Sequence, residues 1–164
     1  MKSFQKFLME SLNSPYKWKW TDKKYDMFHA VFQDSQNRDF GVVFDKYPEG
    51  MNGENVWEIQ FGNFELNVFY QGSKSLNLKN TGHGDSRQIL STIMEILFAF
   101  LKISKNVDEI ILAGSKVEGK ARLYEKMIKK FEPDLKKLGF KGTATHDDDI
   151  DTFFSIINMN KEAY

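Results

Sequence analysis

The residues that suggest chemistry lie in a glycine-rich stretch near the middle of the chain. Gly82 and Gly84 flank His83, Lys79 precedes them in the same polar segment, and Asp85 follows. An apolar helix is expected to begin directly after them. The first backbone N–H groups of a helix have no partner within it, and the helix dipole favours a negative charge there. This stretch therefore predicts an anion site to which Lys79 adds positive charge.

Two features of the same stretch fit a purely structural role. Asp85 with Gln88 fits a helix N-cap and its reciprocal partner, and a capping carboxylate would repel an anion from the N–H groups that it binds. Glycines also let a chain turn tightly into a helix without any ligand. Because short glycine patterns occur often by chance, the anion site and the structural turn both stay open.

The composition places the chain among globular proteins and excludes several kinds of site. Of 164 residues, 41% are hydrophobic and 15 are phenylalanine, which suffices for a substantial core. The 23 basic and 23 acidic residues balance, so no net field draws the chain to nucleic acid or to a membrane surface. The absence of cysteine excludes disulfides, thiolate metal sites and a cysteine nucleophile. No apolar run approaches the ~20 residues of a membrane span, and we expect a cytoplasmic protein.

The first half of the chain predicts an antiparallel meander behind a short amphipathic helix. Apolar residues recur at helical spacing over residues 3–13. We therefore assign 1–14 as an N-terminal helix or targeting segment and 15–164 as a single domain. The expected strands cover residues 15–20, 25–33, 38–46, 56–61 and 64–70, with turns at 34–37 and at Gly62-Asn63.

The first of these strands alternates aromatic and basic residues. Trp18 and Trp20 interleave with Lys17 and Lys19, a pattern that can stack on and neutralise a single-stranded nucleic acid. The same pattern fits an edge strand whose aromatic side chains face inward and whose lysines face water. Zero net charge and the lack of a second basic stripe favour the edge strand over nucleic-acid binding.

The second half predicts helices that pack on the sheet. A segment that is apolar nearly all round is typical of a central helix, and an amphipathic segment follows it. The expected elements are a helix over 86–104, a strand over 108–113, a helix that is capped at Ser115, breaks at Pro133 and ends at Gly139-Phe140, a polar loop over 141–149 and a strand over 152–157.

No metal site is expected. His146 and the aspartates that follow it form the densest acidic run of the chain. The run has neither the ordered ligand spacing of a calcium loop nor the histidine pair of a zinc site. A solvated loop in front of a strand accounts for it.

The order of elements, together with two short motifs, resembles the GNAT superfamily of acyl-CoA-dependent N-acyltransferases. In that family, a loop of pattern Arg/Gln-x-x-Gly-x-Gly/Ala opens the central helix and binds the pyrophosphate of CoA. The matching residues here are Lys79, Gly82 and Gly84, with lysine in the first position. A later family helix often begins Ala-x-x-Leu-Tyr-Glu-Lys, as Ala121 to Lys126 do, although Gly139-Phe140 follows later than in the family. The resemblance implies an α/β (α+β) fold with a mixed, mainly antiparallel sheet and packed helices.

The resemblance also implies a chemistry, namely transfer of an acetyl group from acetyl-CoA to an amine. Tyr124 takes the place of the family tyrosine that protonates the leaving thiolate, and Glu58 lies in the predicted hairpin where a base would sit. The plainer interpretations are that Tyr124 belongs to the core and that Glu58 faces solvent. The residues implied in binding the cofactor are Lys79, Gly82, His83, Gly84 and Asp85.

A second resemblance concerns origin. The opening segment, Met1 to Glu10, resembles the N-termini of tailed-bacteriophage proteins, and the element order is similar to that of a group of such proteins, some described as acetyltransferase-like. This implies a phage-encoded protein in the bacterial host cytoplasm or in the virion. The alternative function is then a non-catalytic module that keeps the fold and binds a capsid, other virion or host protein.

Overall fold

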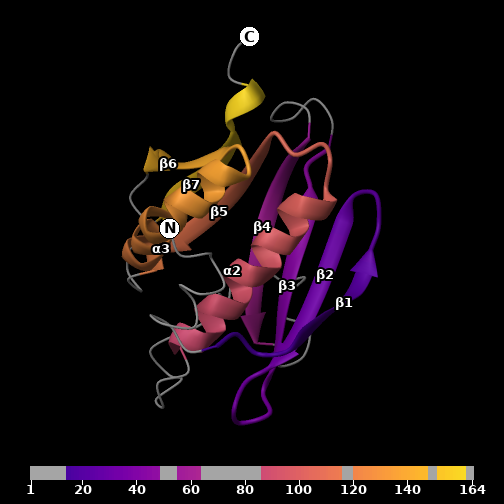
Figure 1. Cartoon of the computed structure of the whole chain (residues 1–164). Helices are drawn as coiled ribbons and strands as arrows, with labels where there is room; N and C mark the ends of the chain where they lie inside the picture. The colour runs from indigo at the N-terminus through magenta and orange to yellow at the C-terminus, as the bar shows by residue number, and fades with distance from the viewer. Residues whose placement is uncertain (1–13, 49–54, 64–85, 116–119, 148–150, 162–164) are drawn as a thin grey trace. The chain divides into compact units, whose positions relative to one another are not determined.

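The structure, a computed structural model, describes residues 14–48, 55–63, 86–115, 120–147 and 151–161 (Figure 1). These ranges form a seven-stranded sheet with the hydrogen-bonded order β1-β2-β3-β4-β5-β7-β6. The strands are β1 (Trp18–Lys23), β2 (Met27–Gln33), β3 (Asp39–Lys46), β4 (Val56–Asn63), β5 (Glu109–Ser115), β6 (Phe140–Asp147) and β7 (Asp151–Asn158). The helices are α2 (Ser86–Ile103), α3 (Lys120–Lys137) and the short 3-10 helix η3 (Met159–Lys161). This is the predicted mixed α+β fold with a mainly antiparallel sheet.

The chain divides into two compact units, each built from two separate stretches. The first unit comprises Met1–Phe44 and Gln60–Phe100, and the second comprises Asp45–Ile59 and Leu101–Tyr164. Strands β3 and β4 each contribute residues to both units. The prediction of a single domain over 15–164 stays a prediction, and the predicted helix over 3–13 lies outside the described residues.

In the first unit, aromatic side chains join α2 to the strands beside which it runs in Figure 1. The Phe100 ring stacks on that of Phe44 with 4.0 Å between centroids, and it meets the Phe28 ring edge-on at 5.1 Å. Phe44 and Phe100 are fully buried. The apolar face of α2 and the inward faces of β2 and β3 therefore form one core.

Strand β1 confirms the edge-strand interpretation of the alternating aromatic and basic residues. It stands at one end of the strand order, with Trp18 and Trp20 half-buried and Lys17 and Lys19 exposed. The Trp18 indole N–H donates to a Glu95 carboxylate oxygen of α2 at 3.1 Å. The Trp20 ring contacts the Phe28 and Phe44 rings, so the two indole side chains lie on the core side of the strand.

In the second unit, α3 packs against β5, β6 and β7 (Figure 1). The helix ends as predicted at Gly139, whose φ of 84° suits a residue without a side chain. The Leu138 and Gly139 N–H groups donate to the carbonyls of Leu135 and Lys136, each at 3.0 Å. These bonds satisfy carbonyls that would otherwise have no partner at the helix end.

Two sequence-based assignments, one of a turn and one of a loop, are wrong. Gly62 and Asn63 belong to β4 and do not form a turn, because β4 has a neighbouring strand on each side and backbone pairing outweighs local turn preference. The predicted strand over 64–70 lies outside the described residues. The predicted loop over 141–149 begins instead as β6, which pairs antiparallel with β7. An edge strand with polar side chains lacks the apolar alternation that reveals a strand in a sequence.

The predicted break at Pro133 is also wrong, since α3 continues through it to Lys137. Proline removes one backbone hydrogen bond from a helix interior. Phe131 and Leu135 lie on either side of it and are 2% and 0% exposed. Burial of these two side chains on one helix face offsets the lost hydrogen bond.

Candidate functional site

A row of polar side chains crosses the sheet of the second unit on the face opposite α3. Tyr47 follows β3, and its N–H donates to the Val56 carbonyl at 2.8 Å. Val56 pairs with Glu109, and Glu58 pairs with Ile111 in the parallel β4–β5 ladder. Directly paired residues share a face, as do residues two apart in a strand.

The rule that paired residues share a face also places one residue of β7 in this row, and it shows that α3 packs on the other face of the sheet. Ser155 pairs with Ile111 and so lies on the Glu109 face. Phe154, which contacts Tyr124 of α3, lies on the other face. We call Tyr47, Glu58, Glu109 and Ser155 the polar row.

Glu58 is the member of the polar row that the sequence singled out as a base. It is half-buried, and its Oε2 accepts a hydrogen bond from the Tyr47 hydroxyl at 3.3 Å. Burial raises the pKa of the Tyr47 hydroxyl above its usual value, and the negative charge and hydrogen bond of Glu58 raise it further. The phenol therefore stays protonated and able to donate at neutral pH. A carboxylate held in this way can accept a proton from a substrate.

The other carboxylate of the polar row is held by a buried hydroxyl. Ser155 is 1% exposed, and its hydroxyl donates to Glu109 Oε1. Sequence reasoning missed Tyr47, Glu109 and Ser155. Tyr47 lies one residue past the predicted strand over 38–46, and the pairing that brings Glu109 and Ser155 together joins strands far apart in the sequence.

Tyr124, the predicted acid, lies near the start of α3. It is 3% exposed, and its ring meets that of Phe154 edge-on with 6.4 Å between centroids. This burial is what the core interpretation expects. The role of Tyr124 in protonating a thiolate stays a prediction.

The predicted cofactor-binding residues lie outside the described part of the chain. These are Lys79, Gly82, His83, Gly84 and Asp85. Helix α2 begins at Ser86, directly after them, as the loop-helix pattern requires. Its first turn has no acidic residue, and Arg87 is exposed there. The helix dipole and the Arg87 guanidinium both favour negative charge at this end of α2.

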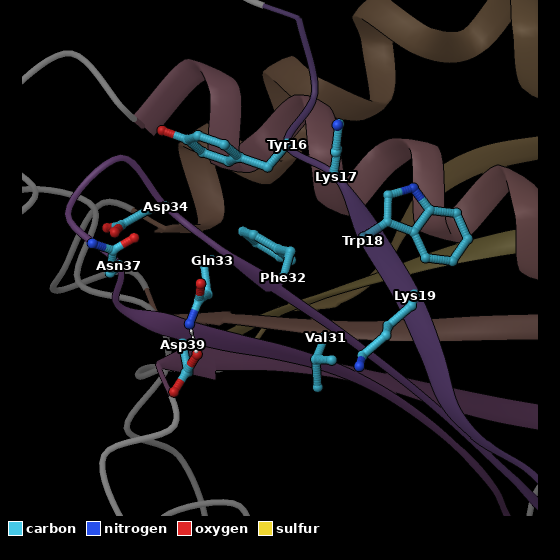
Figure 2. A pocket seen from close by; sticks show the side chains of 10 residues that line it. All are labelled: Tyr16, Lys17, Trp18, Lys19, Val31, Phe32, Gln33, Asp34, Asn37 and Asp39. Atoms are coloured by element: carbon cyan, nitrogen blue, oxygen red, sulfur yellow. Dashed lines mark hydrogen bonds between the residues drawn. The ribbon is translucent and has the colours of Figure 1, made fainter.

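A separate hollow of about 730 Å³ lies in the first unit (Figure 2). Figure 2 shows that its lining side chains do not converge: the Tyr16 ring lies on the helix side of the strands, while Val31 and Lys19 lie on the other. The Gln33 amide donates to the Asp39 carboxylate at 2.8 Å. Lining residues are Tyr16, Lys17, Trp18, Lys19, Val31, Phe32, Gln33, Asp34, Asn37 and Asp39. The spread of the polar groups over both sides gives this hollow no defined chemistry.

The described residues give neither a metal cluster nor a membrane helix. Within those ranges, no group of three or more histidine, cysteine, aspartate or glutamate side chains could hold a metal ion. His146 and Asp147 belong to β6 and Asp151 begins β7, while residues 148–150 fall outside the described ranges. No helix among the described residues is long and apolar enough to cross a membrane.

The fold and the polar row define a mixed α+β protein with antiparallel strands in its first half and a helix–strand–helix arrangement in its second. A family model matches residues 19–163, and the chain belongs to that family, DUF6934, a family of unknown function. No curated protein matches the chain.

Two solved structures are similar over most of the chain. One is smu.2055 from Streptococcus mutans UA159, with 9% identity, a TM-score of 0.43 and coverage of 82% of this chain and 72% of that one. The other is the ribosomal-protein-S5-alanine acetyltransferase from Vibrio fischeri, with 15% identity, a TM-score of 0.41 and coverage of 80% and 62%. Scores this low give no basis for transferring an activity.

Proposed function

We propose that this protein is an acyl-CoA-binding N-acyltransferase that transfers an acetyl group to an amine. The observation that carries the proposal is the setting of Glu58, a half-buried carboxylate on β4 to which the Tyr47 hydroxyl donates at 3.3 Å. Acyl transfer to an amine needs a group that removes the proton of the attacking nitrogen. A carboxylate that is partly withdrawn from water and oriented by a neutral donor suits that task.

The cofactor would be acetyl-CoA, which supplies a thioester carbon to the attacking amine. The first turn of α2, free of acidic residues and with Arg87 exposed, supports binding of the pyrophosphate by the residues before it. The residues proposed to bind the cofactor are Lys79, Gly82, His83, Gly84 and Asp85. Among them, Asp85 carries a negative charge that would repel an anion.

The protein side chains have two proton transfers to perform in this mechanism. Glu58 would accept a proton from the amine as the nitrogen–carbon bond forms, and Tyr124 would donate its hydroxyl proton to the departing sulfur as the carbon–sulfur bond breaks. Because Glu58 and Tyr124 lie on opposite faces of the sheet, the acyl carbon must be one that can be reached from both faces. The products are an N-acetylated amine and free CoA thiol, and the two side chains regain their starting states by exchange with water.

The first test is calorimetric titration of the purified protein with acetyl-CoA, with desulfo-CoA and ATP as controls. We expect micromolar binding that requires the CoA moiety and is not given by ATP. Turnover follows from thiol release with a panel of amines. Because the chain has 0 cysteines, a thiol reagent reports only the released CoA. The absence of any heat at millimolar CoA would overturn the proposal.

The second test replaces the proposed base. Glu58→Gln should lower kcat by about 100-fold or more, as expected when general base catalysis is lost, and should leave acetyl-CoA affinity unchanged. Glu125→Gln is the matched control, since Glu125 is 52% exposed on α3 and pairs with Lys129. Equal loss in both variants would argue against a specific role for Glu58.

A second candidate function is a non-catalytic binding module, phage-encoded and associated with capsid, other virion or host proteins. The observation that favours it is the burial of Tyr124 at 3% exposure against Phe154. A tyrosine in the core stabilises the fold without meeting a thiolate. Tyr124→Phe separates the two candidates: it abolishes turnover in the enzyme and changes only stability in the binding module.

A further inference from the structure

The Tyr47 hydroxyl that donates to Glu58 takes no part in the two proton transfers proposed above, and the geometry of the contact gives it a different role. Tyr47 lies directly after β3, where its N–H donates to the Val56 carbonyl at 2.8 Å. This backbone bond places Tyr47 opposite Val56 and diagonal to Glu58 on the same face. The Tyr47 hydroxyl then reaches Glu58 Oε2 at 3.3 Å. The contact is thus set by strand register as well as by side-chain rotation.

The bond engages one of the two carboxylate oxygens. Within the described ranges, the structure records a hydrogen-bond donor at Oε2 of Glu58 and none at Oε1. A bond at one oxygen restricts rotation of the carboxylate about its last torsion, which is otherwise broad. The second oxygen is then held in a fixed direction for an incoming proton.

The charges on this face explain why a neutral donor is suited to the position. By strand register, Glu109 of β5 lies on the Glu58 face. Glu109 is acidic, so it repels the Glu58 carboxylate. A lysine or arginine partner would neutralise Glu58 and weaken it as a base. The Tyr47 hydroxyl orients the carboxylate and leaves its charge available.

We propose that Tyr47 is a positioning residue that orients Glu58 for removal of the amine proton. This inference rests on the proposed acyltransferase function. Burial and the charge of Glu58 both raise the pKa of Tyr47, so the donor persists across the pH range in which an acyltransferase is assayed. Tyr47 itself exchanges no proton with the substrate.

The test is the steady-state kinetics of Tyr47→Phe with acetyl-CoA and an amine acceptor found in the panel. We expect kcat to fall about fivefold to tenfold, the rate equivalent of one lost hydrogen bond, with KM for acetyl-CoA unchanged. A merely structural role would not give this split between kcat and KM. Tyr25→Phe is the matched control, because Tyr25 is 80% exposed and belongs to the first unit.

A spectroscopic readout tests the contact without relying on activity. The chain has 6 tyrosines. The difference in tyrosinate absorbance between wild type and Tyr47→Phe isolates the titration of the Tyr47 hydroxyl from that of the other tyrosines. Against a Glu58→Gln background, the pKa of Tyr47 should fall toward its usual value, because the charge that raises it is gone. An unchanged tyrosine pKa would overturn the inference even if no amine in the panel proved to be an acceptor.

The outcomes separate the two proposals. An active wild type with full kcat in Tyr47→Phe overturns the role of Tyr47 and leaves the acyltransferase function standing. A wild type that neither binds acetyl-CoA nor releases thiol overturns the acyltransferase function and the role of Tyr47 with it. A selective loss of kcat together with the shifted tyrosine pKa supports both.

Discussion

At the scale of single residues, the carboxylate of Asp34 fixes the turn between β2 and β3. Its side chain is 0% exposed and pairs with the Arg38 guanidinium at 2.6 Å. Its Oδ1 accepts from the Gln36 and Arg38 N–H groups, each at 2.9 Å. The sequence predicted a turn at 34–37 from residue type alone. The structure adds the reason for its shape, since one carboxylate satisfies several donors of the turn.

The same carboxylate makes stability depend on pH. Burial raises the pKa of Asp34, but the hydrogen bonds from Arg38 and Gln36 and the charge of Arg38 outweigh it and leave the pKa below its usual value. A lowered pKa in the folded state gives stability that is present above the unfolded pKa of about 3.9 and is lost as pH falls through the folded value.

Asp34→Asn should therefore destabilise the protein by about 1–3 kcal/mol near neutral pH, the cost of weakening hydrogen bonds to a buried charge. The difference from wild type should shrink as the pH is lowered below about 4. Urea unfolding at a series of pH values measures both effects. Asp39→Asn, at an exposed aspartate after the same turn, is the control. A difference that does not change with pH would contradict the assignment.

At the scale of elements, the approach of α3 to β6 depends on a glycine. A Cβ added at Gly142 would overlap the Cγ2 methyl of Ile128, which is 6% exposed. Gly142→Ala should cost about 1–3 kcal/mol through overpacking. In an Ile128→Ala background the cost should largely vanish, because the nearest remaining Ile128 atom, Cβ, lies 3.4 Å away.

A double-mutant cycle by urea unfolding measures this coupling. The cycle isolates the contact between the two residues from the separate cost of removing the isoleucine. Thr143→Ala serves as the neighbouring control in β6. Additive losses in the double variant would show that Gly142 is needed for some reason other than Ile128.

The elements also show where sequence reasoning succeeds. The apolar helix was expected over 86–104 and is α2, and the end of α3 at Gly139 was expected from the glycine itself. Both signals are local: helical periodicity and a residue that tolerates positive φ. For β6 the decisive contribution is pairing with β7, which no pattern within 141–149 reveals.

For the candidate site too, the sequence predicted one residue, and strand pairing in the structure was needed to find the others. Glu58 was proposed from a family pattern, and the structure places it in the polar row with Tyr47 as hydrogen-bond donor. Tyr47, Glu109 and Ser155 come from separate stretches of the chain, and strand register alone brings them to one face. Sequence spacing therefore suggested one member of the row and could not assemble the rest.

At the scale of the whole molecule, the two compact units are interleaved along the chain. Strands β3 and β4 each supply residues to both units. Neither unit can lose its structure without disrupting strands that the other also uses. A chain of this size with shared strands is expected to unfold in one cooperative transition.

The tryptophans allow this expectation to be tested. Trp18 and Trp20 belong to the first unit and Trp57 to the second. In Trp57→Phe the fluorescence reports the first unit, and in the double variant Trp18→Phe/Trp20→Phe it reports the second. Within each variant, the fluorescence and far-ultraviolet circular dichroism midpoints in urea should coincide. Comparison within one variant removes the stability cost of the substitution itself. Midpoints that separate in either variant would show that one unit unfolds alone, and the prediction of a single domain over 15–164 would then be wrong.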